Sequence, residues 1–178
     1  MRFYYKCDRI LNKMSVKSEI KKLIPERTLS FYHLAMAARA GFYYGRPSKK
    51  MIVIGVTGTK GKTSAANFIW SVLTAGGHMA GLIGTANIRI GEKESLNPYH
   101  MTMPGRFILQ KLLKQMADAS CKFAIIETTS EGIKQWRHFG IFYDIAVFTN
   151  LTPEHLQAHS GSFEKYKEAK GEMFKAIS

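Results

Sequence analysis

The chain has 178 residues, a formal net charge of +13 and 46% hydrophobic residues. This length and composition suit one globular domain with a hydrophobic core. No apolar run reaches the roughly 18–20 residues that a membrane-spanning helix needs, and no clean apolar segment precedes a small-residue cleavage site. The two cysteines, Cys7 and Cys121, have neither metal-binding nor disulfide-framework spacing. A reducing, cytoplasmic setting is therefore expected.

Residues 1–48 are predicted to form a basic, helical leader, which ends at a proline-containing turn over residues 46–50. No DNA- or RNA-recognition motif accompanies its charge, so no nucleic-acid partner is expected. The simplest interpretation is a solvated basic face. Phosphate-rich ligands, or a weak contact of this leader with a membrane surface, stay open as alternatives.

Residues 49–178 alternate between strand and helix patterns. Short apolar runs predict buried strands, and apolar positions at helical spacing predict amphipathic helices. The expected strands are 51–56, 79–85, 122–127 and 143–150; the expected helices are 62–77, 105–120 and 161–177; residues 87–104 are expected to be a hairpin or loop. This order predicts an α/β fold, a mostly parallel sheet with flanking helices, whose ligands bind at the carboxyl ends of the strands.

The stretch "IVIGVTGTKGKTS" (52–64) resembles a phosphate-binding loop with altered spacing. The general pattern places a glycine five residues before the glycine of Gly-Lys-Ser/Thr, and that position is Val56. A glycine-rich turn between strand and helix still directs backbone N–H groups at phosphate oxygens. Lys62 would reach the terminal phosphates, and the Thr63 hydroxyl would bind Mg²⁺. We therefore predict nucleotide binding here in preference to a plain structural turn.

Further polar residues follow the later strands. Glu127 ends the third predicted strand, where phosphate-loop proteins place a second Mg²⁺ ligand, although a carboxylate there can also cap a helix or face solvent. Asn150 and His155 follow the fourth strand, so they are expected near the phosphates. His155 and His159 have metal-pair spacing, but the nearby proline and glycine argue against the regular helix that such a pair needs. By spacing alone, Lys170 is indistinguishable from a solvated lysine.

Three segments together, "GVTGTKGKTS", "IIETTSEG" and "FTNLTPEHLQAHSGSFEKYKEAK", resemble the Mur ligases and their folylpolyglutamate synthetase relatives in order and type. The family loop Gly-Thr-x-Gly-Lys-Thr/Ser matches residues 58–63, which explains the altered glycine spacing. The resemblance covers roughly residues 50–175. It implies that 49–178 is the phosphate-loop-containing central ATP-binding domain, truncated at its C-terminal side.

The resemblance also implies roles for individual residues. The implied catalytic residues are Lys62, Glu127, His155 and Lys170, and the implied nucleotide contacts are Gly58, Thr59, Lys60, Gly61, Lys62, Thr63, Ser64 and Asn150. Thr63 and Glu127 would hold one Mg²⁺, and His155 would help hold a second. Lys170 matches a family lysine that CO₂ converts to N6-carboxylysine, which turns it into an oxygen ligand for the metal. Thr102 and Thr128 would contact the muramoyl-peptide.

The implied activity is an ATP-dependent acid–amino-acid ligase of peptidoglycan precursor synthesis, acting through an acyl phosphate on a UDP-N-acetylmuramoyl-peptide. The third ligase of the pathway, which adds diaminopimelate or lysine, is the most similar type. Lys60 stands where the family usually has Asn, and Met103 replaces the second Thr of a Thr-Thr-Pro motif, so the amino acid and acceptor stay open.

Two alternatives to this activity stay open. One is a poly-γ-glutamate or folylpolyglutamate type ligase; the other is a non-catalytic nucleotide-binding module with a membrane-surface leader. The family's N-terminal uridine-nucleotide domain and C-terminal domain are expected to be absent from this chain. We therefore expect the isolated chain to be an incomplete, inactive enzyme that needs a C-terminal domain for ligation.

Overall fold

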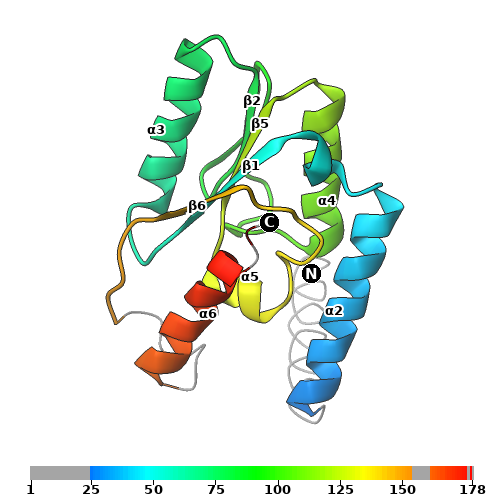
Figure 1. Cartoon of the computed structure of the whole chain (residues 1–178), viewed down its shortest axis with the longest axis vertical. Helices are drawn as coiled ribbons and strands as arrows, with labels where there is room; N and C mark the ends of the chain where they lie inside the picture. Colours follow the sequence, from blue (N-terminus) through cyan, green and yellow to red (C-terminus); the bar gives the residue numbers. More distant parts are fainter. Residues whose placement is uncertain (1–24, 154–160, 176, 178) are drawn as a thin grey trace, which may run out of the picture.

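The computed structural model describes residues 25–153, 161–175 and 177. Its centre is a six-stranded sheet with the strand order β4-β3-β2-β5-β1-β6 (Figure 1). The strands are β1 Ile52–Thr57, β2 Ala80–Ile83, β3 Asn87–Ile90, β4 Lys93–Leu96, β5 Phe123–Glu127 and β6 Ile145–Phe148. Strands β2, β5, β1 and β6 run parallel, and the β3–β4 hairpin adds to β2 in antiparallel fashion.

Five α-helices and one 3-10 helix accompany the sheet in the described part of the chain. They are α2 Glu26–Tyr43, η1 Pro47–Lys50, α3 Lys62–Ala75, α4 Arg106–Asp118, α5 Ser130–Lys134 and α6 Phe163–Lys175. The predicted α/β class is therefore confirmed, with element boundaries shifted by a few residues. The short helix α5, which follows β5, was not predicted; it begins at a Thr129 cap whose hydroxyl accepts from the Gly132 amide.

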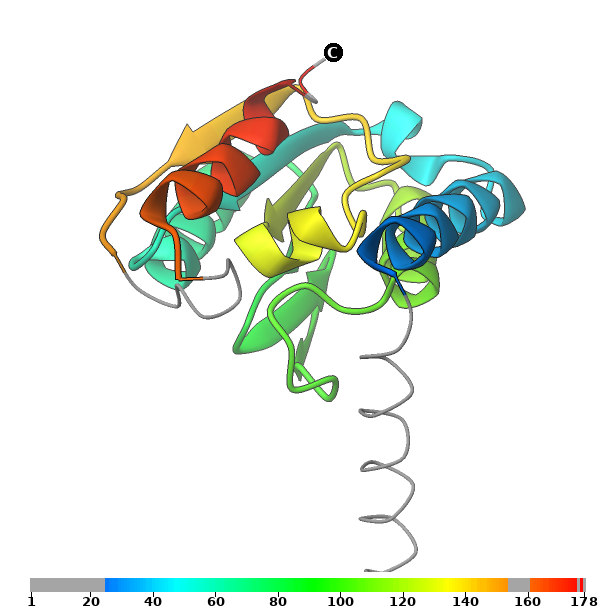
Figure 2. The same cartoon turned by 90° about the horizontal axis from the view of Figure 1, so that it is seen from below.

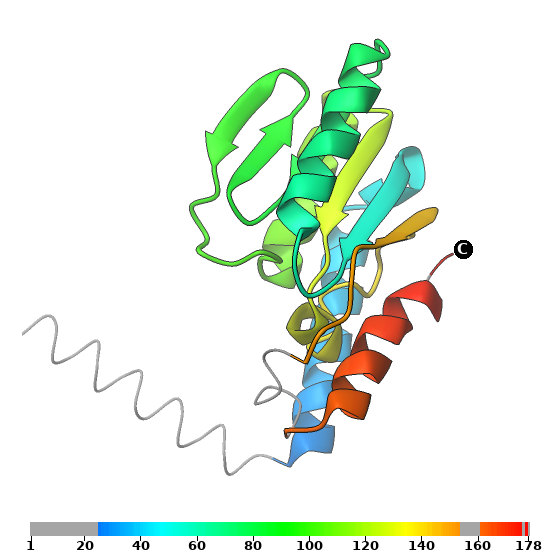
Figure 3. The same cartoon turned by 90° about the vertical axis from the view of Figure 1, so that its left-hand side faces the viewer.

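The sheet is covered on both faces, because its buried strands alternate side chains between two apolar layers (Figures 1 and 3). Ile54 and Val56 of β1 point to the α3 side, where Ala66 is buried. Val53 points to the opposite layer, which α4 covers. On that second face Gly55 lies under α6, and a Cβ at this position would come within 2.8 Å of the Tyr143 ring.

Helix α2 belongs to the same packed unit as the sheet. It lies beside α4 (Figure 2), with Ala37 and Ala40 buried. The Trp136 indole donates a hydrogen bond to the Ser30 hydroxyl at 2.7 Å. Residues 25–48, the second half of the predicted leader, therefore pack against the sheet domain as part of the same fold. Residues 1–24 of that leader lie outside the described residues, and no described helix is long and apolar enough to cross a membrane.

Candidate functional site

The candidate site begins at the turn between β1 and α3. Gly58 has φ 149° and Gly61 has φ 78°, backbone conformations that disfavour other residues. A Cβ at Gly58 would also fall 1.9 Å from the Thr149 hydroxyl. Val56 is a buried residue of β1, which continues to Thr57. The loop therefore starts two residues later than in the general phosphate-loop pattern, and this is why a glycine at position 56 is not needed.

Thr149 and Asn150, which follow β6, hold the backbone of the loop by hydrogen bonds. The Asn150 carboxamide accepts from the Lys60 amide at 2.9 Å and donates to the Lys60 carbonyl at 3.1 Å. The Thr149 hydroxyl donates to the same carbonyl at 2.7 Å. Asn150 was expected to contact the nucleotide; in this structure its side chain holds the loop backbone. The loop's shape is thus fixed by residues about 90 positions further along the chain.

Two lysines converge on this loop. The Lys62 ammonium donates to the carbonyls of Gly58 and Thr59 at 2.8 and 2.9 Å. Lys170, on α6, donates to the same Gly58 carbonyl at 2.6 Å. Burial, and then the positive charge of Lys62, lower the pKa of Lys170 from 10.5 to about 8. The fold therefore gives Lys170 a partly neutral amine near pH 7, which its position in the sequence did not reveal.

Tyr166 lies one helical turn before Lys170 and joins α6 to the loop. Its hydroxyl is 3.0 Å from the Thr59 hydroxyl, which also accepts from the Thr152 amide at 3.0 Å. The Lys170 Nζ lies 4.8 Å from the centre of the Tyr166 ring. Since Tyr166 is almost fully buried, it fixes the distance between α6 and the phosphate loop. Sequence reasoning missed this role, although the spacing of "YKEAK" places both side chains on one face of a helix.

Glu127 lies beside the first turn of α3. Its buried carboxylate accepts from the Thr63 hydroxyl at 3.0 Å and from the Thr85 amide at 3.0 Å. The Thr85 hydroxyl lies 2.9 Å from this carboxylate and 2.9 Å from the Thr102 hydroxyl. Thr85 follows β2, so the rule that functional residues follow parallel strands predicts a residue of its kind there.

The Thr63–Glu127 pair fits a hard divalent cation. In the described part of the chain, the partners of the Glu127 carboxylate are hydroxyl and amide groups, with no cation among them. Carboxylate and hydroxyl oxygens are the donors that Mg²⁺ prefers, usually together with water and phosphate oxygens. No cluster of three or more His, Cys, Asp or Glu residues occurs among the described residues. Such an ion would therefore take its remaining ligands from substrate, from water or from beyond these residues.

Thr128 differs from the expectation that it contacts substrate. Its side chain is fully buried, and its hydroxyl lies 3.2 Å from that of Tyr143. Strand alternation explains this, because Glu127 points to the α3 side and the next residue points to the opposite, buried side. Thr129 and Ser130, at the start of α5, reach the open space instead.

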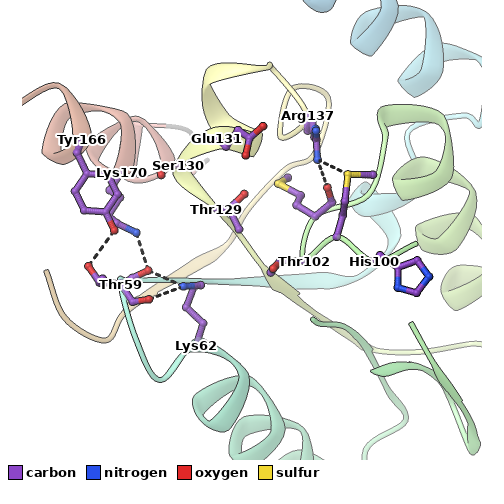
Figure 4. A pocket seen from close by; sticks show the side chains of 13 residues that line it. Thr59, Lys62, His100, Thr102, Thr129, Ser130, Glu131, Arg137, Tyr166 and Lys170 are labelled. Carbon is purple, nitrogen blue, oxygen red and sulfur yellow. Dashed lines mark hydrogen bonds between the residues drawn. The ribbon is translucent and has the colours of Figure 1, made fainter. Parts of the chain in front are cut away.

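An open cavity of about 480 Å³ lies between the loop, α5, α6 and the segment before α4 (Figure 4). It is lined by Gly58, Thr59, Lys62, His100, Met101, Thr102, Met103, Thr129, Ser130, Glu131, Arg137, Tyr166 and Lys170. Arg137 donates to the Met103 carbonyl, so it positions the Thr102–Met103 segment at the cavity wall. No motif in the sequence pointed to Arg137 as a functional residue.

Three further residues were predicted to belong to the site: Ser64, Lys60 and His155. Ser64 is exposed in the first turn of α3 and does not line the cavity. The Lys60 backbone belongs to the loop, as the contacts of Asn150 show. His155, and its proposed partner His159, lie outside the described residues.

Residues 56–178 match the family described as the Mur ligase middle domain. The chain is 42% identical over 151 residues to "UDP-N-acetylmuramoyl-L-alanyl-D-glutamate--2,6-diaminopimelate ligase" of Geobacillus kaustophilus; that match covers 85% of this chain and 30% of the relative. It is 38% identical over 157 residues to "UDP-N-acetylmuramyl-tripeptide synthetase" of Roseiflexus sp., with 87% and 31% covered. A solved diaminopimelate ligase of the same description superimposes with a TM-score of 0.63 at 32% identity, over 72% of this chain and 26% of that one.

An α/β domain with a glycine-rich loop between β1 and α3 and a buried carboxylate beside it defines a protein of the phosphate-loop class. Since the family match covers more than half of the chain, the protein belongs to the Mur ligase family. The chain spans about 30% of the length of the curated relatives that it matches.

Proposed function

We propose that the protein takes part in ATP-dependent ligation of an amino acid to a UDP-N-acetylmuramoyl-peptide in peptidoglycan precursor synthesis, in the cytoplasm. The observation that carries this proposal is the convergence of Lys62 and Lys170 on the Gly58 carbonyl, within the same cavity that Thr102 lines. Lys62 could bind phosphate, Lys170 has a lowered pKa, and Thr102 could contact a second substrate. All three residues line the same cavity. The names of the relatives support the substrate class.

In the proposed reaction a substrate carboxylate takes the γ-phosphoryl group of ATP, and the products are an acyl phosphate and ADP. An amino-acid amine then attacks the acyl carbon, and phosphate leaves. The loop amides and the N-terminus of α3 would bind the phosphates. Lys62 would exchange its contacts with the loop carbonyls for phosphate oxygens, which would lower the repulsion between phosphate and carboxylate.

Thr63 and Glu127 are the residues that would hold Mg²⁺. When bound, the ion neutralises phosphate charge and helps to orient the transferred group. Thr85 keeps the Glu127 carboxylate in place through its amide and hydroxyl. Gly84 allows this approach, because a Cβ there would lie 2.6 Å from the carboxylate.

Lys170 has the chemistry required for carbamylation. Its neutral Nζ would attack CO₂, form an N–C bond and release a proton, which leaves an anionic N6-carboxylysine. Because the pKa is about 8, roughly a tenth of the amine is neutral at pH 7, far more than for an exposed lysine. The modification would replace a buried positive charge beside Lys62 with a negative one, so it would be electrostatically favourable.

Calorimetric binding of a panel of acceptors tests the proposed function, because ligation itself is not expected of the isolated chain. The 178-residue chain with MgATP is titrated with UDP-N-acetylmuramoyl-alanyl-glutamate, a folyl-glutamate or a γ-glutamyl peptide. We expect saturable binding of the muramoyl-peptide and not of the other two acceptors. Thr102→Arg should abolish this binding, because the larger side chain would fill the cavity beside position 102. Preference for a folyl or γ-glutamyl acceptor would favour the second ligase type. Absence of binding to every acceptor would favour a non-catalytic nucleotide-binding module.

A further inference from the structure

The helix α2 has two apolar faces, of which the described part of the protein covers one. Along its buried side, Ala37, Ala40 and Gly41 pack toward α4 and the turn before β6. The opposite side carries Phe31 and Phe42, which are 73% and 82% exposed. Figures 1 and 2 place this helix at the outer edge of the described fold. Large aromatic side chains gathered and exposed on one face of a helix mark a candidate interaction surface.

The outer face forms a continuous stripe at helical spacing. Phe31, Ala35, Ala38 and Phe42 follow one another at intervals of four, three and four residues, so they lie in one row. Tyr32 and Tyr43 flank this row and are 54% and 74% exposed. The two pairs of aromatic side chains are roughly 16 Å apart along the helix. All of the stripe residues are exposed in the folded chain.

The charges along α2 are mostly positive. Arg27 and Arg39 are exposed and border the stripe, and Arg46, Lys49 and Lys50 are exposed directly after the helix. Apart from Glu26 at its first position, α2 contains no acidic residue. Residues 1–24, which precede it in sequence, carry seven Lys or Arg against two acidic residues.

We propose that this outer face of α2 docks on an anionic phospholipid surface. Aromatic residues bordered by arginines are typical of helices that lie in the membrane interface. Their rings enter the headgroup region while the guanidinium groups bind lipid phosphates. Each basic residue near such a surface adds attraction that salt weakens. The protein would then lie on the membrane through α2, and the phosphate loop, which follows the carboxyl end of β1, would stay open to soluble nucleotide.

A second copy of the chain fits this face less well. The stripe could pair with itself in antiparallel fashion, since Phe31 would then face Phe42 and Ala35 would face Ala38. However, this pairing would also bring Arg27 near Arg46 of the other copy, and each chain carries a net charge of +13. Like charges on both sides of an apolar contact favour an anionic partner over a second basic one.

Vesicle flotation of the full chain tests the proposal. The vesicles are either phosphatidylcholine alone or equal parts phosphatidylcholine and phosphatidylserine, at low and high salt. We expect binding to the anionic vesicles, weakened by salt, and reduced about tenfold or more in a Phe31→Ser, Phe42→Ser double variant. The matched control is Phe68→Ser, because Phe68 is 71% exposed on α3, away from the stripe, and should not contribute.

Three results would overturn the proposal. Absence of binding by the unmodified chain would exclude lipid docking. Equal binding by the double variant, with its circular dichroism unchanged, would assign binding to the basic N-terminal residues and not to α2. A concentration-dependent dimer in sedimentation velocity that Phe31→Ser, Phe42→Ser abolishes, without vesicle binding, would identify a second copy as the occupant.

Discussion

Lys62 and Lys170 donate to the same acceptor, the carbonyl oxygen of Gly58, at 2.8 and 2.6 Å. One lysine begins α3 and the other lies on α6, more than 100 residues later. Two amines this close cannot both carry a full charge without cost, and the buried one has the lowered pKa. Burial is the larger cause of this lowered pKa and Lys62 is the second, so the phosphate loop contributes to the protonation state of Lys170.

Lys62→Met should raise the pKa of Lys170 above about 8, because it removes the second cause of the shift. The pKa should still stay below 10.5, since burial is the larger cause and remains. The measurement is an NMR pH titration of the chain with ¹³C-methylated lysines, with Lys170→Met used to assign the signal. The exposed Lys114→Met is the control, and an unchanged Lys170 titration in Lys62→Met would contradict the coupling.

Lys170→Met should stabilise the fold at neutral pH. The unfolded chain holds this proton up to about pH 10.5, whereas the folded chain releases it near pH 8, so the charge destabilises the folded state fully below pH 8. The variant's advantage in free energy of unfolding should be on the order of 2 kcal/mol at pH 7 and vanish as the pH rises from 8 to 10.5. Urea unfolding across this range measures it, beside the exposed Lys167→Met. A constant difference across the range would show that the stability effect does not come from titration.

Gly58→Ala should destabilise the protein by at least about 2 kcal/mol and weaken nucleotide binding. The added Cβ would overlap the Thr149 hydroxyl, and φ 149° is unfavourable for alanine. Combining it with Thr149→Ala should restore part of the loss, because the overlapping atom is removed. Gly171→Ala is the control, since its Cβ would meet nothing within 4 Å on a helix. Thermal unfolding of all four proteins tests the prediction, and equal effects of the two glycine variants would refute it.

Tyr166→Phe should weaken nucleotide binding a few-fold and cost about 1 kcal/mol of stability. The variant keeps the ring beside Lys170 but removes the contact with the Thr59 hydroxyl. The pKa of Lys170 should therefore change little in Tyr166→Phe. It should change more in Tyr166→Leu, which also removes the ring. Calorimetry with ATP and the lysine titration separate these effects. A Phe variant indistinguishable from wild type in ATP affinity would mean that Thr59 is held by the Thr152 contacts alone.

Much of the fold could be predicted from local patterns. The apolar runs and helical spacings located the four parallel strands and the long helices that follow them, because buried parallel strands need uninterrupted apolar residues and surface helices need one apolar face. The β3–β4 segment was expected only as a hairpin or loop, since its residues form no apolar run. The register was not predictable, since it depends on which strands pair. Val56 lies opposite Glu127 in β5 and Val147 in β6, and this pairing brings the loop, the carboxylate and the segment containing Asn150 together.

The site was predictable only in part. Lys62, Thr63 and Glu127 follow from a motif and a strand end, and the structure places the Thr63 and Glu127 side chains 3.0 Å apart. Arg137 and the orientation of Thr128 follow from tertiary packing, which leaves no local signal. The lowered pKa of Lys170 likewise comes from burial and from a residue distant in sequence.

Calorimetric titration with ATP, with and without Mg²⁺, tests most directly whether this loop and Glu127 hold a nucleotide with its metal. We expect the wild-type chain to bind ATP more tightly with Mg²⁺ and Lys62→Ala to abolish binding. Glu127→Gln, which keeps the shape of the side chain, should remove the Mg²⁺ enhancement, on the order of ten- to a hundredfold, and retain the metal-independent binding. Equal ATP affinity in wild type and Lys62→Ala, or an undiminished Mg²⁺ effect in Glu127→Gln, would contradict it.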